Sequence, residues 1–397
     1  MKATFAPPPP NRREVLGPDD VTDAALEAVL ADLWRVRAVT LLESTAEPVA
    51  YDVPSILTGA RTWVRGTAEV DGAARAFTLF VKRVHHWRHS PAFAFLPPEL
   101  AQWAATTVPW RAEVLCYGSD LAERLPDGLT MPRALHIDDR PDETAVLWLE
   151  AVEHDDAPWD RTTYVEAARL LGRLAGSAEV GDLADLDPQE WHIHYFVEGR
   201  IAHTVLPGLF DDATWRHPLV APHFGDLRTL LLGVAGHLDA LAAEFAALPH
   251  RAAHGDACPN NLLRHPDRPG FTLIDYGFWR SQPVGFDLSQ LLVGDIQVAR
   301  RDADDLPELA EACLTAYAAG LADEGLEVAD DVLRRSHAVS LMLFNGLPSL
   351  PTEMVAEADR LEAGDGLGEE QRHAWDHWSA QRAGVARYAL DVLARTA

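Results

Sequence analysis

The sequence predicts an α+β protein of two lobes, a β-rich N-terminal lobe followed by a mostly helical C-terminal lobe. The chain has 397 residues, 48% of them hydrophobic, which is enough to build two cores of moderate size. Strand-forming segments and a hairpin-turn signal lie before residue 154, and apolar residues at helical spacing dominate after it. This change of pattern predicts a boundary near residues 150–158.

We expect three parts along the chain. Residues 1–20 are rich in proline and charge and show no apolar period, which is typical of an extended or mobile tail. Residues 21–153 form the expected N-terminal lobe, and residues 154–397 form the expected C-terminal lobe. We find no internal repeat and no heptad array in either lobe.

The N-terminal lobe is expected to begin with a short helix over residues 21–36, behind a threonine and aspartate cap signal. Segments 61–70 and 73–84 read as two strands, and Asp71-Gly72 between them is a strong signal for a hairpin turn. A second strand pair and one helix between the two pairs complete the order ββαββ. These are strands 132–137 and 144–154 and helix 110–125.

The C-terminal lobe is expected to begin with a helix over residues 162–176. Its clearest helix spans residues 226–248, where the apolar residues share one face. Those residues are Leu227, Leu230, Leu231, Val234, Leu238, Leu241 and Phe245. The final hundred residues are again helical in pattern.

Charge and cysteine content narrow the classes of function. With 34 basic and 61 acidic residues, the formal charge of −27 repels nucleic acid and anionic lipid, so neither is an expected partner. Cys116, Cys258 and Cys313 form no disulfide framework or zinc motif, which suits a reducing cytoplasm. The first residues lack a signal-peptide core and no run of about 18 apolar residues occurs, so we expect a soluble intracellular protein.

The chemically informative segment is residues 251–279. It contains His254-Gly255-Asp256, then Asn261, then Asp275-Tyr276-Gly277. Asp256 and Asn261 are expected on a loop that follows the long helix, and Asp275 is expected to end a strand. A turn at 265–270 between two short strands would bring the three residues together.

These residue types suit phosphoryl transfer. That reaction needs an acceptor for the proton of the substrate hydroxyl and hard oxygen ligands for Mg²⁺. Asp256, Asn261 and Asp275 supply both kinds of group. Aspartate and asparagine also commonly satisfy turn backbones, so each residue alone would favour a structural role. Their joint spacing, with a matching first lobe, favours the chemical role.

Lys82 supports this interpretation from the first lobe. It lies in the middle of the strand 73–84 among apolar neighbours, where an ammonium group needs an anionic partner. A nucleoside triphosphate is such a partner. The alternative is a strand lysine whose charged end reaches solvent.

The motif HGDxxxxN followed by IDYG resembles the aminoglycoside phosphotransferase family, which has a protein-kinase-like two-lobed fold. The resemblance implies that Asp256 is the catalytic base and that Asn261 and Asp275 bind Mg²⁺. It also implies that the first lobe binds ATP or GTP, while the second carries the catalytic loop and acceptor site. Lys82 would contact the phosphates and pair with a helix glutamate. We favour Glu113 in that role over Glu99, which follows two prolines.

Other nucleotide contacts follow from the resemblance. Gly59 and Gly66 would belong to a degenerate phosphate-covering loop, although such glycines are also common in turns. The carbonyl of Glu150 and the amide of Val152 would contact the purine, because this segment takes the place of the linker between lobes. Asp287 resembles the buried aspartate that anchors the kinase catalytic loop, and an ordinary helix cap fits it equally well.

Three further observations concern the substrate. Cys258 stands where serine/threonine kinases carry a lysine, which makes a protein substrate less expected. The segment 191–204 resembles the elaborations of small-molecule kinases; His192, His194 and Tyr195 could touch substrate, but packed or surface roles are commoner. Trp375 and Trp378 share one helical face and are expected in the core.

We therefore expect an ATP- or GTP-dependent O-phosphotransferase that uses Mg²⁺ and acts on a hydroxyl of a small, possibly cationic molecule. An antibiotic such as an aminoglycoside, and a sugar or amino sugar metabolite, are the two acceptor classes that we consider; the first would imply a role in antibiotic resistance. The catalytic motif does not choose between them. The alternatives are a nucleotide-binding pseudokinase that regulates a partner, and transfer of a nucleotidyl group from the same site.

Overall fold

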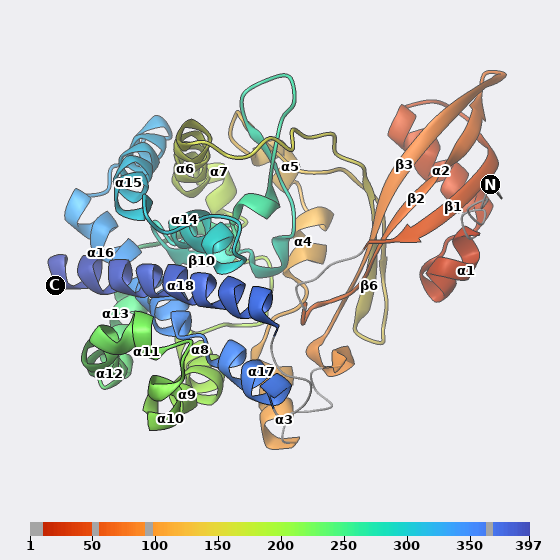
Figure 1. Ribbon diagram of the computed structural model, residues 1–397. Helices are drawn as coiled ribbons and strands as arrows, with labels where there is room; N and C mark the ends of the chain where they lie inside the picture. Colours follow the sequence, from red (N-terminus) through yellow and green to blue (C-terminus); the bar gives the residue numbers. More distant parts are fainter. Residues whose placement is uncertain (1–10, 50–54, 92–97, 363–367) are drawn as a thin grey trace. The chain divides into compact units, whose positions relative to one another are not determined.

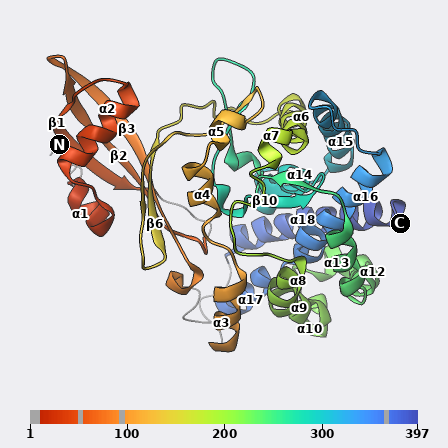
Figure 2. The same cartoon turned by 180° about the vertical axis from the view of Figure 1, so that it is seen from behind.

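The structure is a computed structural model that describes residues 11–49, 55–91, 98–362 and 368–397 (Figures 1 and 2). The expected fold class is confirmed, because a β-rich N-terminal part precedes a mostly helical C-terminal part. The chain divides into two compact units, which we describe separately as the sheet unit and the helical unit. The sheet unit comprises Met1–Glu123 and Thr130–His154, and the helical unit comprises Arg124–Leu129 and Asp155–Ala397.

The sheet unit is built on a five-stranded antiparallel sheet with the order β1-β2-β3-β6-β5. The expected hairpin is confirmed: Val70 of β2 pairs with Ala73 of β3 across Asp71 and Gly72. Both turn residues have positive φ, the conformation that fits a tight hairpin to the twist of its strands. The strands are β1 (Thr40–Pro48), β2 (Thr58–Val70), β3 (Ala73–His85), β5 (Ala134–Asp139) and β6 (Thr144–Glu150).

Strand β1 is absent from the sequence-based prediction. It lies at an edge of the sheet, and its register shifts between Leu41 and Glu43. Most of its side chains are exposed or half-buried, so the sequence shows no clean alternation of apolar and polar residues. Because of this extra strand, Lys82 lies on the third strand of the unit rather than on the second.

Helices cover the sheet unit on both faces. Figure 1 shows α2 beside the strands β1 to β3, where Leu26, Leu30, Leu79 and Trp148 are among the buried residues of a shared core. Two helices differ from the prediction: α3 was not expected, and the expected helix 110–125 is divided into α4 and α5. The helices here are α1 (Arg12–Leu16), α2 (Asp23–Trp34), α3 (Pro98–Thr107), α4 (Ala112–Gly118) and α5 (Leu121–Arg124), the last of which crosses the boundary of the units.

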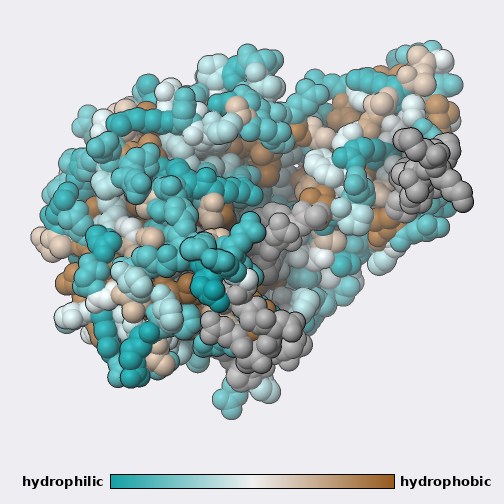
Figure 3. Space-filling model, viewed as in Figure 1, coloured by the Kyte–Doolittle hydropathy of each residue, from teal (hydrophilic) through white to brown (hydrophobic). Residues whose placement is uncertain are grey.

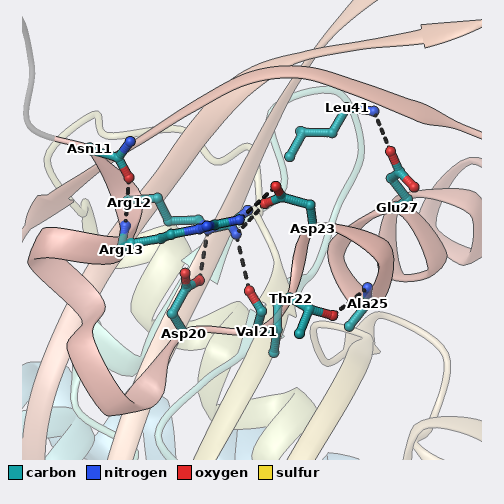
Figure 4. Close-up of polar contacts among 10 residues, drawn as sticks. All are labelled: Asn11, Arg12, Arg13, Asp20, Val21, Thr22, Asp23, Ala25, Glu27 and Leu41. Atoms are coloured by element: carbon teal, nitrogen blue, oxygen red, sulfur yellow. Dashed lines mark hydrogen bonds and ion pairs between the residues drawn. The ribbon is translucent and has the colours of Figure 1, made fainter.

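The prediction of a mobile tail is wrong for residues 11–20. The first ten residues lie outside the described part of the chain, but α1 and a following 3₁₀ turn are folded onto the sheet unit. Arg12 is 1% exposed and contacts Asp20, Asp23 and the carbonyl of Val21 (Figure 4). These buried charge pairs are invisible to an analysis of composition, which registers only proline and charge.

The tail is also tied to the strands. The carboxylate of Asp19 forms ion pairs with two guanidinium groups. One oxygen lies 3.2 Å from a guanidinium nitrogen of Arg83 on β3, and the other lies 2.9 Å from one of Arg140. Arg83 is the neighbour of Lys82 in the chain. Asp19 is 6% exposed, and its carboxylate is therefore compensated by two guanidinium groups rather than by water.

The helical unit contains the remaining helices. Figure 2 shows the long α18 running past α14 and α16, with which it is in contact. The helices are α6 (Arg161–Gly176), α7 (Ala178–Gly181), α8 (Ile193–Phe196), α9 (Leu206–Phe210), α10 (Asp212–Arg216), α11 (Ala221–Phe224), α12 (Arg228–Ala235), α13 (Leu238–Ala247), α14 (Asp287–Gln297), α15 (Leu306–Asp323), α16 (Asp330–Leu341), α17 (Thr352–Glu362) and α18 (Glu369–Arg395). Two π-helical segments, Val197–Val205 and Met342–Gly346, interrupt the regular helices.

Short strands carry the loops of the helical unit. β7 pairs with β10, and β8 forms a hairpin with β9 through the turn that the sequence indicated at 265–270. The strands are β7 (His250–Ala253), β8 (Leu262–Arg264), β9 (Phe271–Leu273) and β10 (Arg280–Pro283); β4 (Leu129–Thr130) lies across the boundary of the units.

The prediction of a single helix over residues 226–248 is wrong. The chain bends by 65° between α12 and α13, at Gly236 and His237. Leu230, on α12, also lies outside the expected apolar face and is 55% exposed. Glycine and a non-helical histidine end the first helix, a local effect that the continuous apolar period conceals.

Among the described residues, no single helix is long and apolar enough to cross a membrane; the bent pair of α11–α12 and α13 meets the length and composition test only when its two segments are combined. On the face in Figure 3, hydrophilic side chains cover most of the described surface. Trp375 and Trp378 are half-buried, and the indole of Trp378 donates to the carbonyl of Ile296.

Candidate active site

Lys82 and Glu113 form a buried ion pair in the sheet unit. Lys82 lies on β3 and Glu113 in the first turn of α4, and the ammonium nitrogen is 2.6 Å from one carboxylate oxygen and 2.8 Å from the other. Both residues are 3% exposed. Val81 beside Lys82 faces the core under α2, so the alternation of the strand sends Lys82 to the opposite face. Glu99 on α3 is exposed instead.

The other residues expected to contact nucleotide lie at the ends of strands in the same unit. Gly59 is the second residue of β2 and not part of a loop; the chain before it, between β1 and β2, includes residues outside the described ranges. A β-carbon on Gly59 would lie 2.8 Å from the side chain of Arg83. Glu150 ends β6, and its carboxylate accepts the amide of Arg133. Val152 follows, and its carbonyl lies 3.3 Å from the Nδ1 atom of His154.

In the helical unit, strand β7 leads directly into the loop that carries Asp256. His254 is fully buried and lies between the two halves of the candidate site: its Nε2 atom is 2.9 Å from the carbonyl of Ile274. The amide of Asp256 donates to its Nδ1 atom at 3.4 Å. These partners indicate a neutral imidazole with the proton on Nε2. Gly255 has φ +84°, and a β-carbon there would lie 2.1 Å from the carbonyl of Phe278. Only glycine fits this position.

Asp256 and Asn261 are in direct contact. The amide nitrogen of Asn261 donates to the carboxylate of Asp256 at 3.0 Å and to its backbone carbonyl at 2.8 Å. Asn261 is 6% exposed and ends a 3₁₀ turn that begins at Pro259. With its nitrogen committed to Asp256, the amide oxygen is the remaining ligand atom of Asn261.

The β8–β9 hairpin brings Asp275 to the same loop. Leu262 pairs with Leu273, and the amide of Ile274 donates to the carbonyl of Asn261 at 3.0 Å. Asp275 itself has φ 63° and ψ 66°, a left-handed conformation that is uncommon for a residue with a side chain. The sequence spacing thus becomes spatial proximity through the register of two short strands.

The charges of both aspartates act on Cys258. Burial raises the pKa of its thiol, and the negative charges of Asp256 and Asp275 raise it further. Cys258 is therefore a neutral thiol rather than a reactive thiolate. Both carboxylates therefore lie close enough to the Cys258 thiol for their negative charges to raise its pKa.

Asp287 anchors the loop that carries Asp256. Its two carboxylate oxygens accept the amides of His254 and Gly255, each at 2.9 Å. It makes no capping bond to its own helix α14, so the structure decides between the two roles that the sequence left open. Burial raises the pKa of Asp287 to about 6, against the lowering effect of the two amide bonds.

A cavity of about 410 Å³ lies in the helical unit, lined by residues from the segments 185–192 and 279–281. Its wall includes Arg280, which pairs with Ala253 in the β7–β10 ladder and so lies beside the strand that leads to Asp256. The guanidinium of Arg280 lies over the ring of Trp191, 5.3 Å from its centre. Burial lowers the pKa of Arg280, and the charges of Asp187 and Asp185 raise it.

Two hydrogen bonds hold the cavity walls together. The indole of Trp279 donates to the carbonyl of Leu183 at 2.8 Å, and the amide of Ser281 donates to Asp185 at 3.2 Å. Of the residues expected near substrate, His192 lines the cavity, whereas His194 is exposed and Tyr195 contacts the ring of His192. Asp185 and Asp187 were not predicted, and their only signal was an acidic segment before 191–204; Trp191 begins the segment 191–204 but was not singled out.

The residues fit a magnesium ion that also takes oxygen from a nucleotide. The carboxylate of Asp275 and the amide oxygen of Asn261 are hard oxygen donors, which Mg²⁺ prefers. The described residues contain no group of three or more histidine, cysteine, aspartate or glutamate side chains arranged as a metal site. Mg²⁺ at phosphates keeps waters and phosphate oxygens as its other ligands.

Comparisons with known proteins place this geometry in a family. The sequence model of the phosphotransferase enzyme family, APH, matches residues 99–329, which is more than half of the chain and includes Glu113, Asp256, Asn261 and Asp275. A search of curated protein sequences gives no significant match.

The comparison with solved structures gives matches that include the following three. The amicoumacin kinase hAmiN, in complex with AMP-PNP, Ca²⁺ and Ami, is 14% identical with a TM-score of 0.49, over 85% of this chain and 87% of its own. An aminoglycoside phosphotransferase from Alicyclobacillus acidocaldarius is 14% identical with a TM-score of 0.46, over 88% and 92%. A choline/ethanolamine kinase family protein from Mesorhizobium loti is 15% identical with a TM-score of 0.45, over 83% and 89%. The match of the family model over residues 99–329 shows that this chain belongs to the phosphotransferase enzyme family.

Proposed function

We propose that the protein transfers the γ-phosphoryl group of ATP or GTP to a hydroxyl of a small molecule, with Mg²⁺ as cofactor. The observation that supports the proposal is the loop in which Asn261 binds the carboxylate of Asp256 while the β8–β9 hairpin holds Asp275 beside it. A proton acceptor and two hard oxygen ligands are the groups that phosphoryl transfer requires from a protein. The family of the chain supports the same class of reaction.

Asp256 is the proposed catalytic base. Its carboxylate would accept the proton of the acceptor hydroxyl, and the bond from Asn261 would fix its orientation. Asn261 and Asp275 are the proposed ligands of Mg²⁺. When bound, the ion neutralises charge on the phosphates of the donor. Asp287 and His254 would hold the loop in position through backbone bonds, so that the base needs no rearrangement.

The nucleotide contacts that we propose lie in the sheet unit. Lys82, oriented by Glu113, would bind the α- and β-phosphates, because an ammonium already held in one position loses little freedom on binding. Gly59 would border the phosphates at the start of β2. The carbonyl of Glu150 and the amide of Val152 would bind the purine at the end of β6. We also propose a cytoplasmic location, where these triphosphates and Mg²⁺ are present.

We propose the cavity of the helical unit as the site for part of the acceptor. Asp185, Asp187 and Glu190 line it together with one arginine, so its net charge is negative. Carboxylates accept hydrogen bonds from hydroxyl and ammonium groups, and Trp191 offers an apolar wall. These groups fit an aminoglycoside, another amine-bearing antibiotic or an amino sugar. A role in antibiotic resistance would follow for the first two acceptor classes.

The proposal is tested by incubating the full chain with Mg²⁺ and ATP or GTP, and with a panel of aminoglycosides, amino sugars and neutral sugars. Mass spectrometry of the acceptor should find an increase of about 80 mass units, the mass of one phosphoryl group. Asp256→Asn serves as the matched control and should give little product. A nucleotidyl adduct would replace the proposal by nucleotidyl transfer. Nucleotide binding without any transfer across the panel would favour the pseudokinase.

A further inference from the structure

A buried turn in the helical unit connects β10 with α14. The turn contains Gly285, whose φ of +84° is a backbone conformation that favours glycine. A β-carbon there would lie 2.9 Å from the side chain of Leu333. The amide of Gly285 does not face solvent; it donates to the hydroxyl oxygen of Tyr317 at 3.0 Å. A side chain from a distant helix therefore contacts this turn, together with Ser336, whose hydroxyl donates to the carbonyl of Val284 at 2.6 Å.

Tyr317 is held rigidly on α15. It is 2% exposed, and α15 packs closely against α6 through two glycines. A β-carbon on Gly172 would lie 2.2 Å from the carbonyl oxygen of Tyr317, and one on Gly320 would lie 2.0 Å from that of Arg169. The two backbones can approach this closely only because both positions lack a side chain. The hydroxyl of Tyr317 thus comes from a fixed backbone.

Two residues after Gly285, the chain reaches Asp287. The carboxylate of Asp287 accepts the amides of His254 and Gly255 at 2.9 Å each, and the next residue is Asp256. Burial raises the pKa of Tyr317, and the negative charge of Asp287 raises it further, which places the hydroxyl in the field of that carboxylate. Tyr317 is therefore linked to the loop by its hydrogen bond to Gly285, by the two residues of chain from Gly285 to Asp287, and by the bonds of the Asp287 carboxylate to His254 and Gly255.

We propose that Tyr317 is a positioning residue for Asp256: its hydroxyl fixes the Gly285 turn so that both oxygens of Asp287 meet the loop amides. The importance of this position for catalysis rests on the proposed function, in which Asp256 is the base. The positioning itself does not, because it concerns the loop of the free protein. The two parts can therefore fail separately.

The test is hydrogen exchange of the full chain, without nucleotide, for wild type and Tyr317→Phe. Phenylalanine keeps the ring and removes only the acceptor for the Gly285 amide. We expect peptides covering residues 250–262 to exchange about tenfold faster, the factor that corresponds to about 1.4 kcal/mol for one buried hydrogen bond. Peptides from α13 and α18 should exchange as in wild type.

Tyr388→Phe is the matched control. Tyr388 is a buried tyrosine of α18 whose hydroxyl has no hydrogen-bond partner among the described residues, so its removal breaks no bond to the loop. This variant should leave the exchange of residues 250–262 unchanged. Equal acceleration in both variants, or acceleration spread over the whole helical unit in Tyr317→Phe, would overturn the proposal. So would a Tyr317→Phe chain that does not fold, because the hydroxyl would then support the unit rather than the loop.

A double variant tests the route. If Tyr317 acts through Asp287, Tyr317→Phe combined with Asp287→Asn should exchange in the loop no faster than Asp287→Asn alone. Additive effects would contradict this route. With an acceptor in hand, Tyr317→Phe should lower kcat about tenfold and leave the KM for nucleotide unchanged. Faster loop exchange in a chain that transfers no phosphoryl group would remove the proposed function and leave the positioning role intact.

Discussion

The two units of this protein hold their charged residues in opposite ways. In the sheet unit, Lys82 and Glu113 compensate each other directly, at 2.6 Å and almost without exposure. In the helical unit, Asp256 and Asp275 have the same sign of charge and both act on Cys258. Backbone bonds, strand register and a left-handed residue contribute to their positions.

The difference separates two kinds of preorganisation. In the ion pair of the sheet unit, each charge already faces an opposite charge. The two carboxylates of the helical unit are oxygen ligands of the kind that Mg²⁺ prefers. The comparison supports the proposal that the helical unit carries the metal ligands and the sheet unit carries a cation already oriented for phosphate.

The largest effect is expected from Asp256→Asn. Asparagine keeps the shape and can accept the bond from Asn261, but it cannot take a proton, and general-base catalysis contributes about 10²–10⁴ in rate. We expect kcat to fall by that factor, about 3–5 kcal/mol of barrier, while the affinity for Mg²⁺-nucleotide is unchanged. Steady-state rates and calorimetric titration measure the two quantities.

Asp275→Asn is the counterpart that sharpens this result. It should shift the Mg²⁺ dependence of the rate to higher concentration and weaken nucleotide binding, because a charged ligand becomes neutral. Normal turnover in Asp256→Asn, or wild-type metal-nucleotide binding in Asp275→Asn, would show that the two roles are assigned wrongly.

A comparable effect on stability is expected when the ion pair is broken. Glu113→Ala would leave the ammonium of Lys82 buried without a carboxylate, which costs about 3–5 kcal/mol of unfolding free energy. The double variant Lys82→Met with Glu113→Leu removes both charges and should be close to wild type in stability. Urea denaturation measures the difference. A double variant as unstable as the single one would mean that packing, not the unpaired charge, causes the loss.

A smaller effect should appear as a pH dependence of stability through Asp287. Its folded pKa of about 6 lies above the ordinary aspartate value of about 3.9, so the folded protein binds this proton more tightly than the unfolded chain. The contribution to stability is then fully present below about pH 4 and is lost as the pH rises through 6, by up to about 3 kcal/mol.

Asp287→Asn does not titrate and provides the reference for that measurement. The difference in unfolding free energy between wild type and Asp287→Asn should change in favour of Asp287→Asn between about pH 4 and pH 7. Urea denaturation at several pH values gives this difference, and other titrating groups cancel because both chains contain them. A difference that is constant with pH would contradict the raised pKa.

The smallest effect is expected from Gly59→Ala. Its β-carbon would lie 2.8 Å from Nε of Arg83 and 2.9 Å from Nδ1 of His85, which are side-chain rather than backbone atoms and can shift. We expect a change of less than about 1 kcal/mol in unfolding free energy. Gly255→Ala in the helical unit should be far more harmful, because its β-carbon meets the backbone of Phe278 and its φ is +84°. Similar losses in both variants would contradict this contrast, and thermal unfolding measures them.

The site could be predicted from sequence where it depends on spacing within one segment. Asp256, Asn261 and Asp275 lie within twenty residues, and the turn between the two short strands is marked by proline and glycine, so their proximity follows from local structure. Glu113 could be preferred over Glu99 because its helix is the better defined. In contrast, Arg280 and Trp191 are far apart in the chain, and only the β7–β10 pairing and a cation–π contact bring them to one cavity.

The N-terminal residues show a second limit. Proline and charge predicted a tail, and the structure instead buries Arg12 against Asp20 and Asp23. Charge-pair burial depends on which side chains meet after folding, and composition contains no record of it. The edge strand β1 was not predicted for a related reason. Its pairing with β2 is set by the sheet, while its own sequence lacks a clear alternation of apolar and polar residues.

The sequence by itself determined the α+β class, the β2–β3 hairpin and the candidate catalytic motif, because each depends on residue order over short distances. It also indicated Glu113 as the partner of Lys82, and the structure shows that pair. Only the tertiary structure decided that Asp287 holds the loop rather than its own helix, and that Tyr317 reaches the turn before it. These contacts join residues about thirty positions apart. Their partners are chosen by how strands and helices pack, since packing alone fixes which buried groups lie within hydrogen-bond distance.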